Sequence, residues 1–485
     1  MHSRFSAANI GLVLGPLFFA VVYFGFAPKG LSPDAIAALA VALWIGTWWV
    51  TEAVPIAVSA LLPMVLFPLT GALDLTTTTV AYGHKYVFLY LGGFLLAIAI
   101  EKVNLHRRIA LTIIALIGTR MRLIVLGFMV ATAFLSMWIS NTATSVMMLP
   151  IGLAIIAQYR DHPETPENEH TQFGKMLMLS IAYSASIGGM ATLIGTPPNL
   201  VLVGIVKELY GVEIGFLDWM LLAFPLSVVL LVVCWLYLTR MAITLKADDF
   251  AGGVEEIKRQ RLALGRMNSS EKKVLLVFVL TAIAWMSRSF LLVPILPAID
   301  DTIIALASGI VLFVLPGSSK GEAILHWDDS KRVPWGILLL FGGGLAIAQG
   351  FKDTGLAQWF AEQLVTLQFL PLLLMTLVLV ATINFLTEIT SNLATTAMIL
   401  PVLAPLAAAM GVHPYTFMIG ATLAASCAFM LPVATPPNAV VFGSGYINMS
   451  DMIRAGLGLN LFSILLVTFW VYYLMPLLWP LQALS

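Results

Sequence analysis

Two short polar motifs each occur twice in this chain, inside long apolar sequence. Residues 140–144 read Ser-Asn-Thr-Ala-Thr, and residues 391–395 read Ser-Asn-Leu-Ala-Thr. Residues 196–199 and residues 435–438 both read Thr-Pro-Pro-Asn. Polar, helix-breaking sequence at membrane depth is tolerated only where it is buried in protein or lines a cavity. Paired interruptions at corresponding positions of two halves indicate the binding site of a duplicated transporter.

The two Ser-Asn motifs have the composition of a turn between two half-length helices. Such a turn exposes the amide N–H groups at the start of the second helix, where the helix dipole places about half a positive charge. Asn141 and Asn392 add amide donors, and Thr142 adds a hydroxyl donor. Two turns that face each other would therefore hold an anion with a negative group at each end.

The same segments supply neutral oxygen atoms that suit a hard monovalent cation such as sodium. A hydroxyl residue, Ser136 or Thr387, stands four positions before each motif serine and therefore on the same helix face. Gly195 and Ala434 directly precede the Thr-Pro-Pro-Asn copies, where an unwound backbone frees carbonyl oxygens for a cation. Two symmetric sodium sites that flank one anion site are the expected arrangement.

The composition places these motifs in an all-α polytopic membrane protein embedded in a lipid bilayer. Hydrophobic residues make up 60% of the chain and charged residues 10%, and the mean hydropathy is +0.96. A soluble protein carries about 25% charged residues. The net charge of zero argues against nucleic acid as a partner. Cys234 and Cys427 lie in apolar runs and are too few for a disulfide framework, so we expect both in the core.

Apolar stretches of membrane-spanning length predict about 11 transmembrane helices in two repeats. Residues 1–34 form an N-terminal helix and connection, 35–246 the first repeat, 247–272 a cytoplasmic linker, and 273–485 the second repeat. Each repeat should contain a re-entrant hairpin, at about 123–157 and 365–410, and a broken helix, at about 174–209 and 415–446.

The distribution of lysine and arginine gives the predicted topology, because cytoplasmic loops are enriched in both residues. With the N-terminus inside and both hairpins re-entrant, 20 of the 25 basic residues fall on the cytoplasmic side, including those of a predicted loop at 102–122. The C-terminus then lies outside, in the periplasm or extracellular space. The first hairpin enters from inside and the second from outside, so the two repeats are inverted.

The repeat extends beyond the motifs. Residues 140–150 match residues 391–401 at seven of eleven positions, with an offset of 251, and the Thr-Pro-Pro-Asn copies are offset by 239. Glycine pairs, Gly92-Gly93 and Gly342-Gly343, precede the hairpins in both halves. Small residues of this kind commonly serve close helix packing in membranes, and we assign these glycines that role.

Three charged residues in or beside predicted spans need a role, because intramembrane charges are usually functional. Glu388, three residues before Ser391, is expected to accept backbone N–H bonds that fix the hairpin tip, with direct cation or proton coupling as the alternative. Glu52 lies at a predicted cytoplasmic helix end and is read as interfacial or as a structural partner. Arg288 is expected to pair with an acid.

The chain lacks the usual signatures of an enzyme or an ATP-driven pump. It contains no nucleotide-binding glycine motif, no His-Cys-carboxylate spacing typical of a metal site, and no serine-histidine or aspartyl dyad. We therefore expect no catalytic residues and no organic cofactor.

At these motifs the chain resembles the divalent anion/sodium symporter family, which carries di- and tricarboxylates such as succinate, fumarate, malate and citrate. The resemblance covers almost the whole chain and rests on both Ser-Asn hairpins and both Thr-Pro-Pro-Asn breaks. It implies eleven spans, two re-entrant hairpins, a homodimer, and a scaffold domain against which a transport domain moves like an elevator.

The resemblance also implies the residues of the site. Its first sodium site corresponds to Ser136, Ser140, Asn141 and Gly195, and its second to Thr387, Ser391, Asn392 and Ala434. Its carboxylate contacts correspond to Asn141, Thr142, Thr196, Asn392 and Thr435. One departure is Leu393, at a position where many members have threonine, so one hydroxyl donor is missing and the identity of the anion is left open.

The expected function is secondary active transport, with sodium as the co-transported ion and a C4-dicarboxylate of the succinate, malate and fumarate class as substrate. A sodium-independent dicarboxylate exchanger, or a carrier for citrate or sulfate, is the alternative within transport. A channel is a third reading, which the two inverted motif pairs disfavour. The expected location is a bacterial inner membrane.

Overall fold

The computed structural model describes residues 7–118, 120–161, 169–243, 245, 251–318, 322–364 and 371–479. The start of the predicted second hairpin at 365–370, the start of the linker at 247–250, and both chain ends lie outside these ranges. Within them the regular structure is helical, apart from one isolated β-bridge between Pro316 and Ala323. Nine helices of this part are long and apolar enough to cross a bilayer, and four shorter apolar helices accompany them. The predicted class, an all-α polytopic membrane protein, is confirmed.

In the described part of the first half, twelve α-helices follow one another. They are α1 (Ala7–Gly25), α2 (Pro33–Thr51), α3 (Ile56–Ser59), α4 (Leu62–Thr70), α5 (Leu75–Tyr82), α6 (Lys85–Lys102), α7 (Leu105–Ile117), α8 (Met121–Ser136), α9 (Asn141–Arg160), α10 (Glu169–Gly189), α11 (Pro197–Tyr210) and α12 (Phe216–Tyr237), which continues as the π-helix η1 (Leu238–Ala242).

The second half begins after a polar connection that contains α13 (Ala251–Ala263). Its helices are α14 (Ser269–Ser287) with η2 (Arg288–Leu292), α15 (Asp301–Val314), η3 (Trp327–Arg332), α16 (Trp335–Asp353), α17 (Leu356–Leu364), α18 (Leu372–Leu386), α19 (Asn392–Ala409), α20 (Pro414–Ala425), α21 (Pro436–Phe442), and α22 (Met449–Phe469) with η5 (Trp470–Leu474) and α23 (Met475–Leu478).

The two stretches predicted as broken helices are each two helices joined by irregular backbone. In the first half α10 ends at Gly189 and α11 begins at Pro197. In the second half α20 ends at Ala425 and α21 begins at Pro436. Proline fits the first helical position, because it has no N–H to leave unpaired there, and it disfavours helical backbone in the residue before it. The Pro-Pro pairs therefore start the second helix of each break. We refer to residues 190–196 as break 1 and to residues 426–435 as break 2.

Two polar stretches that the sequence predicted as connections contain helices. The stretch 102–122 includes α7, whose buried side chains Leu105, Ala110, Leu111 and Ile114 form one apolar face that packs on α8. The linker contains α13, which packs against α7 and α9. The apolar stretch 55–73 contains two separate helices, α3 and α4, with Pro55 at the N-cap of one and Pro63 in the first turn of the other.

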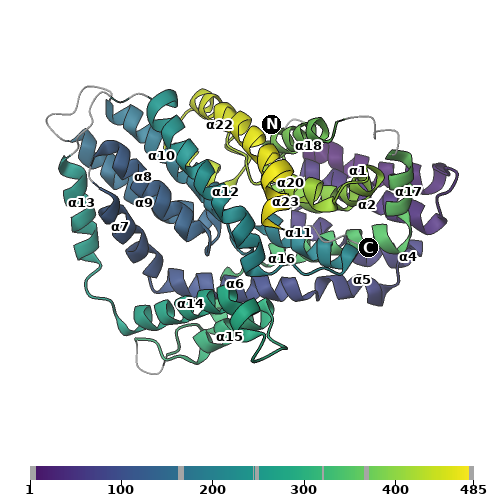
Figure 1. The fold of residues 1–485 in the computed structure, drawn as a ribbon, viewed down its shortest axis with the longest axis horizontal. Coiled ribbons are helices and arrows are strands. Elements are labelled where there is room, and N and C mark those ends of the chain that lie inside the picture. The colour runs from purple at the N-terminus through teal and green to yellow at the C-terminus, as the bar shows by residue number, and fades with distance from the viewer. Residues whose placement is uncertain are drawn as a thin grey trace.

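The helices form two groups at opposite ends of an elongated molecule (Figure 1). At one end α2 packs against α1, α4 and α17, and at the other α8 packs against α7, α9 and α10. Helix α6 lies beside α14 and α15 and packs closely on α15. That contact depends on Gly92, because a Cβ atom there would lie 2.5 Å from the carbonyl carbon of Ala305.

The two broken helices interlock between these groups. Helix α21, which follows break 2, packs against α9 and α10, and α11, which follows break 1, packs against α19 and α20. The helix that follows each break thus contacts two helices of the other repeat. One is the helix that follows the Ser-Asn motif, and the other is the helix that precedes the break. This exchange brings the two motif pairs into one region of the molecule.

Candidate ion and substrate site

The first Ser-Asn motif lies at the turn between α8 and α9. Ser140 is the N-cap of α9, and its hydroxyl accepts a hydrogen bond of 3.3 Å from Ala143 N, as is usual for a serine in this position. Ser136, at the end of α8, is fully buried. Its Oγ donates to Ala185 O at 2.7 Å and lies 2.5 Å from the side-chain amide of Asn141.

The amide of Asn141 meets three oxygen atoms from different segments. The amide atom nearest Ser136 Oγ also lies 3.1 Å from Ala185 O and 3.3 Å from Gly195 O. With nitrogen in this position, the amide donates to its neighbours. With oxygen in this position, four oxygen atoms from the hairpin turn, α10 and break 1 converge, and a small cation satisfies all four. The cluster therefore has the composition of a sodium site in one of its two amide orientations.

Gly189 leaves the space that the Asn141 side chain occupies. A Cβ atom on Gly189 would lie 2.3 Å from Asn141 Oδ1 and 2.9 Å from its Cγ, distances at which one group must move. A Cβ atom on Gly195 would lie 2.4 Å from Gly189 O. Gly189 therefore allows the end of α10 to approach the hairpin turn, and Gly195 allows the two ends of break 1 to approach each other.

The second half repeats the first cluster. Thr387, fully buried at the end of α18, has its Oγ1 2.5 Å from Asn392 Oδ1 and 3.1 Å from Ala425 O. Ser391 is the N-cap of α19, although its side chain makes no capping hydrogen bond. Ala434 is buried in break 2, and its N–H donates to Leu431 O at 3.2 Å.

The asparagines of the two Thr-Pro-Pro-Asn motifs hold the breaks in shape. Asn199 Nδ2 lies within hydrogen-bonding distance of three carbonyl oxygens, those of Gly189, Met190 and Thr192, and the shortest bond is 2.7 Å, to Thr192 O. Asn438 Nδ2 donates to Ala428 O at 3.2 Å and to Leu431 O at 3.0 Å. Both side chains are fully buried. These amides stabilise carbonyl groups that an unwound helix would otherwise leave unpaired.

The hydroxyl residues predicted to contact the anion differ in exposure. Thr196 and Thr435 are the N-caps of α11 and α21 and are each 4% exposed. Thr435 Oγ1 accepts from Asn438 N at 3.3 Å, whereas Thr196 makes no capping bond. Thr142 is exposed in the first turn of α9, and Leu393 is buried at the equivalent place in α19.

The structure thus groups Ser136, Asn141 and Gly195 in one cluster, and Thr387 and Asn392 in the other. Sequence reasoning missed the carbonyl oxygens of Ala185 and Ala425, which complete the two clusters. One signal for them was available, because an Ala-Ser pair occurs at 185–186 and again at 425–426.

Comparison with known proteins identifies the family. Residues 6–480 match the family model described as the sodium:sulfate symporter transmembrane region. The chain belongs to the divalent anion/sodium symporter family. The resemblance drawn from the four motifs is confirmed, and the family is one of transport proteins rather than enzymes.

Curated relatives within this family are similar along nearly their full length. The sodium-dependent dicarboxylate transporter SdcS of Staphylococcus saprophyticus is 45% identical, with 96% of this chain and 91% of that protein aligned. SdcS of Staphylococcus aureus strain bovine RF122 is 47% identical, with 98% and 92% aligned.

Two solved transporter structures share the fold at low sequence identity. Neisseria gonorrhoeae MtrF, described as illuminating a class of antimetabolite efflux pumps, aligns with a TM-score of 0.62 and 14% identity over 98% of this chain and 96% of its own. Alcanivorax borkumensis YdaH, described as a transporter of unusual topology, aligns with a TM-score of 0.57 and 13% identity over 86% and 89%.

The three charged residues weighed in the sequence have distinct surroundings in this symporter-family chain. Glu388 is buried and accepts hydrogen bonds from the backbone of break 2. Arg288 pairs with an acid, as expected, because its Nε lies 2.8 Å from Asp301 Oδ1. Glu52 is exposed and ends α2 in the left-handed conformation, with a φ of 48°.

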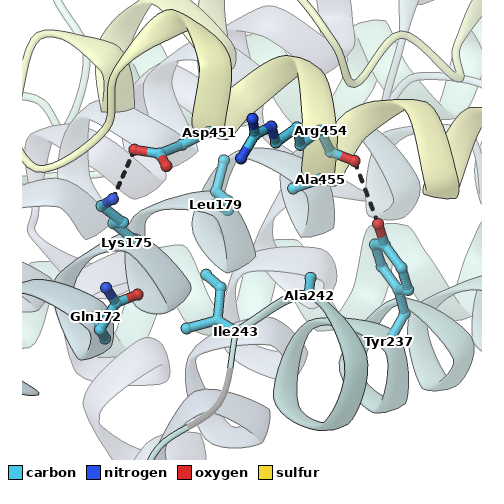
Figure 2. A pocket seen from close by; sticks show the side chains of 9 residues that line it. All are labelled: Gln172, Lys175, Leu179, Tyr237, Ala242, Ile243, Asp451, Arg454 and Ala455. Atoms are coloured by element: carbon cyan, nitrogen blue, oxygen red, sulfur yellow. Dashed lines mark hydrogen bonds and ion pairs between the residues drawn. The ribbon is translucent and has the colours of Figure 1, made fainter.

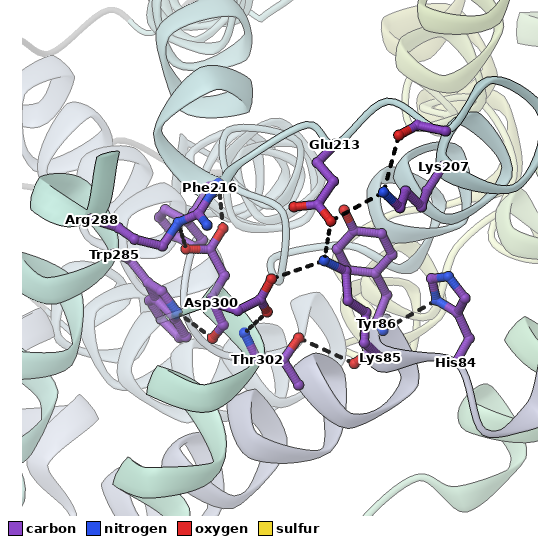
Figure 3. A network of polar contacts seen from close by, with 12 residues as sticks. His84, Lys85, Tyr86, Lys207, Glu213, Phe216, Trp285, Arg288, Asp300 and Thr302 are labelled. Atoms are coloured by element: carbon purple, nitrogen blue, oxygen red, sulfur yellow. Dashed lines mark hydrogen bonds and ion pairs between the residues drawn. The ribbon is translucent and has the colours of Figure 1, made fainter. Parts of the chain in front are cut away.

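A polar network joins the loop between α11 and α12 to α6 and α15 (Figure 3). Lys85 Nζ lies 2.6 Å from Glu213 Oε1 and 2.9 Å from Asp300 Oδ2, and Lys207 Nζ lies 3.2 Å from Glu213. Lys352 also pairs with an acid near this loop, because its Nζ lies 4.0 Å from Glu208 Oε1. The network is separate from both oxygen clusters.

A cavity of about 170 Å³ lies between α10, η1 and α22 (Figure 2). Lys175 on α10 and Asp451 on α22 form an ion pair of 2.8 Å at its edge. Lys175 precedes Gly189 by almost four helical turns, about 21 Å along α10. The cavity is therefore distant from the motif clusters, and we assign it no part in ion or substrate binding.

Proposed function

We propose that this chain is a secondary active transporter that couples sodium to the uptake of a C4-dicarboxylate. The SdcS relatives, named sodium-dependent dicarboxylate transporters, support sodium and a dicarboxylate as the transported species. The observation that carries the proposal is the repeated cluster of hydroxyl, asparagine amide and backbone carbonyl at the two hairpin turns.

Each cluster provides one proposed sodium site. In the first, Ser136 Oγ, Asn141 Oδ1 and Gly195 O would coordinate the ion together with Ala185 O, and Ser140 would complete the shell from the N-cap. In the second, Thr387 Oγ1, Asn392 Oδ1 and Ala425 O take the equivalent places, with Ser391 and Ala434 beside them. All these ligands are neutral oxygens. They suit a monovalent cation that the transporter has to release on the other side of the membrane.

The proposed anion site lies between the two hairpin turns. The N-termini of α9 and α19 direct backbone N–H groups and the positive end of each helix dipole toward a carboxylate. Asn141 and Thr142 supply donors at one end, and Asn392 supplies a donor at the other. Thr196 and Thr435 supply hydroxyls from the ends of the two breaks.

Coupling between sodium and the anion follows from Asn141 and Asn392, because each belongs both to a proposed cation site and to the proposed anion site. Asn141 and Asn392 each use the side-chain oxygen for a cation and can use the nitrogen for the anion. A bound sodium ion would fix the amide in the orientation that presents its nitrogen to the substrate. Sodium binding therefore prepares the anion site, and its charge offsets that of the dicarboxylate.

Alternating access is proposed to proceed by an elevator-type movement in a homodimer. The hairpins and broken helices pack on one another, α8 and α9 on α10, and α18 and α19 on α20, so they can move as one transport domain. The remaining helices would form the scaffold and the dimer contact. We place the protein in a bacterial inner membrane with the N-terminus in the cytoplasm.

The test is uptake of radiolabelled succinate into proteoliposomes that contain the purified protein. We expect accumulation under an inward sodium gradient and none when potassium replaces sodium. Uptake that needs no sodium and appears only in vesicles preloaded with dicarboxylate would instead identify an exchanger. Uptake of sulfate or citrate, but not of succinate, would overturn the substrate class.

A further inference from the structure

Glu388 is the most heavily hydrogen-bonded side chain near the second cluster. Its Oε1 accepts from Phe429 N at 2.7 Å and from Met430 N at 2.9 Å. Its Oε2 accepts from Met430 N at 3.1 Å and from Leu431 N at 3.0 Å. Asn460 Nδ2, from α22, donates to Oε1 at 2.7 Å. The carboxyl group thus joins the hairpin turn after α18, break 2 and α22.

The contacts of Glu388 suit the ionised carboxylate. All five hydrogen bonds come from N–H donors, and an ionised carboxylate is purely an acceptor. The residue is 3% exposed, so these bonds replace the water that the charge has lost. Hydrogen bonds to a charged group are stronger than those between neutral groups. Replacing the carboxylate by an amide converts one acceptor oxygen into an NH2 donor, so at least one N–H group of break 2 loses its partner.

The first half secures its break with different groups. The position equivalent to Glu388, 251 residues earlier, is Met137. Its backbone carbonyl accepts a hydrogen bond of 2.5 Å from Thr192 Oγ1, and the same hydroxyl accepts from Gly195 N at 3.1 Å. Trp219 on α12 donates to Met190 O at 3.0 Å. Neutral groups therefore connect the hairpin turn to break 1, whereas a carboxylate connects the turn to break 2.

Break 2 also fits closely against α22 at the same place. A Cβ atom on Gly456 would lie 2.3 Å from Phe429 O, so α22 contacts the loop backbone directly. Asn384, one turn before Glu388 on α18, donates to Cys427 O at 2.7 Å. The segment 427–431 is therefore held from two helices immediately after Ala425, whose carbonyl belongs to the second cluster.

We propose that Glu388 and Asn460 form a positioning unit for the second sodium site alone. Glu388 directly follows Thr387, and the loop that it holds runs from Ala425 to Ala434, so the unit sets the distance between the hydroxyl and carbonyl ligands of that site. The unit does not contact the ion or the anion. The two sodium sites are consequently unequal, because only the second depends on a buried charge. This inference rests on the proposed function and assigns a further residue pair to it.

The test is the sodium dependence of Glu388→Gln in two assays. In proteoliposomes we expect the half-saturating sodium concentration for succinate uptake to rise at least about tenfold, the loss expected when one charge-assisted hydrogen bond is removed. The uptake curve should become less sigmoidal in sodium, because the first site is then already saturated in the concentration range in which the weakened second site fills. In detergent without substrate, the sodium-induced rise in the melting temperature should shift to higher sodium concentration.

Two further variants separate positioning from general damage. Asn460→Ala removes one of the five bonds and leaves the carboxylate, so a smaller shift in the same direction is expected. Met137→Leu, at the equivalent place in the first hairpin, keeps the backbone carbonyl that Thr192 uses and should leave sodium dependence unchanged. If Glu388→Gln does not yield folded protein, Asn460→Ala carries the test by itself.

These measurements distinguish failure of the positioning role of Glu388 from failure of the proposed transport function. A wild-type protein without sodium-driven uptake and without a sodium-induced melting shift refutes both. A wild-type protein that responds to sodium, together with Glu388→Gln and Asn460→Ala variants of unchanged sodium dependence, overturns the positioning role alone. An equal shift in Met137→Leu would also overturn it, because the effect would then not be specific to the second site.

Discussion

Ser136 and Asn141 form the same contact in the first hairpin as Thr387 and Asn392 do in the second, with 2.5 Å between the hydroxyl oxygen and the nearest side-chain amide atom in each. Each hydroxyl also reaches a backbone carbonyl of the facing broken helix, at 2.7 Å and 3.1 Å. The pairs come from helix ends separated by a four-residue turn, so a change in the turn alters the cluster directly. The most direct tests of the proposed site are therefore made at these turns.

Asn141→Ala and Asn392→Ala should each abolish sodium-coupled uptake. Either change removes the amide that the proposed cation and anion sites share, whereas it leaves the helix caps Ser140 and Ser391 in place. The measurement is succinate uptake in proteoliposomes, with size-exclusion chromatography to establish that the variants are folded. Uptake at the wild-type rate by either variant would refute the site assignment.

Gly189→Ala should impair sodium binding without a change in any proposed ligand. The new Cβ atom would lie 2.3 Å from Asn141 Oδ1, so the amide has to move away from Ser136 and Gly195. We expect the half-saturating sodium concentration to rise severalfold in the uptake assay.

Gly420→Ala provides the matched control for that substitution. Gly420 is also in a buried helix, α20, but a Cβ atom there would lie 3.4 Å from Val380 Cγ2, an ordinary contact. Replacing glycine by alanine inside a helix stabilises the helix by about 0.5–1 kcal/mol. Transport by Gly420→Ala should therefore be unchanged, and equal defects in both variants would contradict the role of Gly189.

The side chains of the candidate clusters were predictable from sequence because local spacing places them. Ser136 and Thr387 stand at the end of the first hairpin helix and a short turn joins each to its motif serine, so the pair is close although it does not share a helix face as predicted. The Pro-Pro pairs start the helices that follow the breaks. The carbonyls of Ala185 and Ala425 were not predictable in the same way, because any residue supplies a carbonyl and only the fold decides which one is nearby. Asn460 was missed because it lies 72 residues from Glu388 and joins it only through packing of α22.

The amphipathic helices were the least predictable part of the fold. Helix α7 contains Arg107 and Arg108 among apolar residues. Because charged residues interrupt an apolar span, this stretch was predicted as a loop. The buried set at Leu105, Ala110, Leu111 and Ile114 is typical of a helix that lies on the protein surface with one apolar face. Membrane spans are recognised by continuous apolar sequence, which an amphipathic helix on the protein surface does not have.

Glu213→Gln should lower stability slightly at neutral pH and not at low pH. The hydrogen bond from Lys85 lowers the pKa of the Glu213 carboxyl. Because the folded-state pKa lies below that of an unfolded glutamate, about 4.3, the ion pair contributes fully above that value. Its contribution is lost as the pH falls through the folded-state pKa.

The measurement for Glu213 is the melting temperature of the wild type and of Glu213→Gln in detergent, from pH 7 down to the lowest pH at which both proteins are folded. Glu213 is 41% exposed, so we expect the pair to contribute less than about 1 kcal/mol and to weaken in high salt. The curves of wild type and variant should converge as the pH falls below 4.3. A deficit that persists unchanged at low pH would show that the Glu213 charge is not its source.

Leu393→Thr should alter the choice of anion more than the dependence on sodium. Leu393 occupies the position in α19 that Thr142 occupies in α9, so the substitution restores a hydroxyl donor at the second end of the proposed anion site. The nearby hydroxyl of Thr390 does not replace it, because that group already donates to Leu386 O at 2.8 Å and pairs with Thr395 Oγ1 at 2.7 Å. Neither Thr387 nor Asn392 is changed, so the second sodium site should retain its affinity.

The measurement for Leu393 is competition of unlabelled succinate, malate, fumarate, citrate and sulfate against labelled succinate in proteoliposomes. An added donor favours anions with an additional oxygen near one carboxylate, so malate and citrate should gain relative to succinate. A single well-placed hydrogen bond contributes about 0.5–1.5 kcal/mol, equivalent to a change of roughly two- to tenfold in relative affinity. Thr142→Leu, which removes the donor at the other end, is the matched variant and should change the preference in the opposite direction. An identical anion profile in all three proteins would show that neither position contacts the substrate.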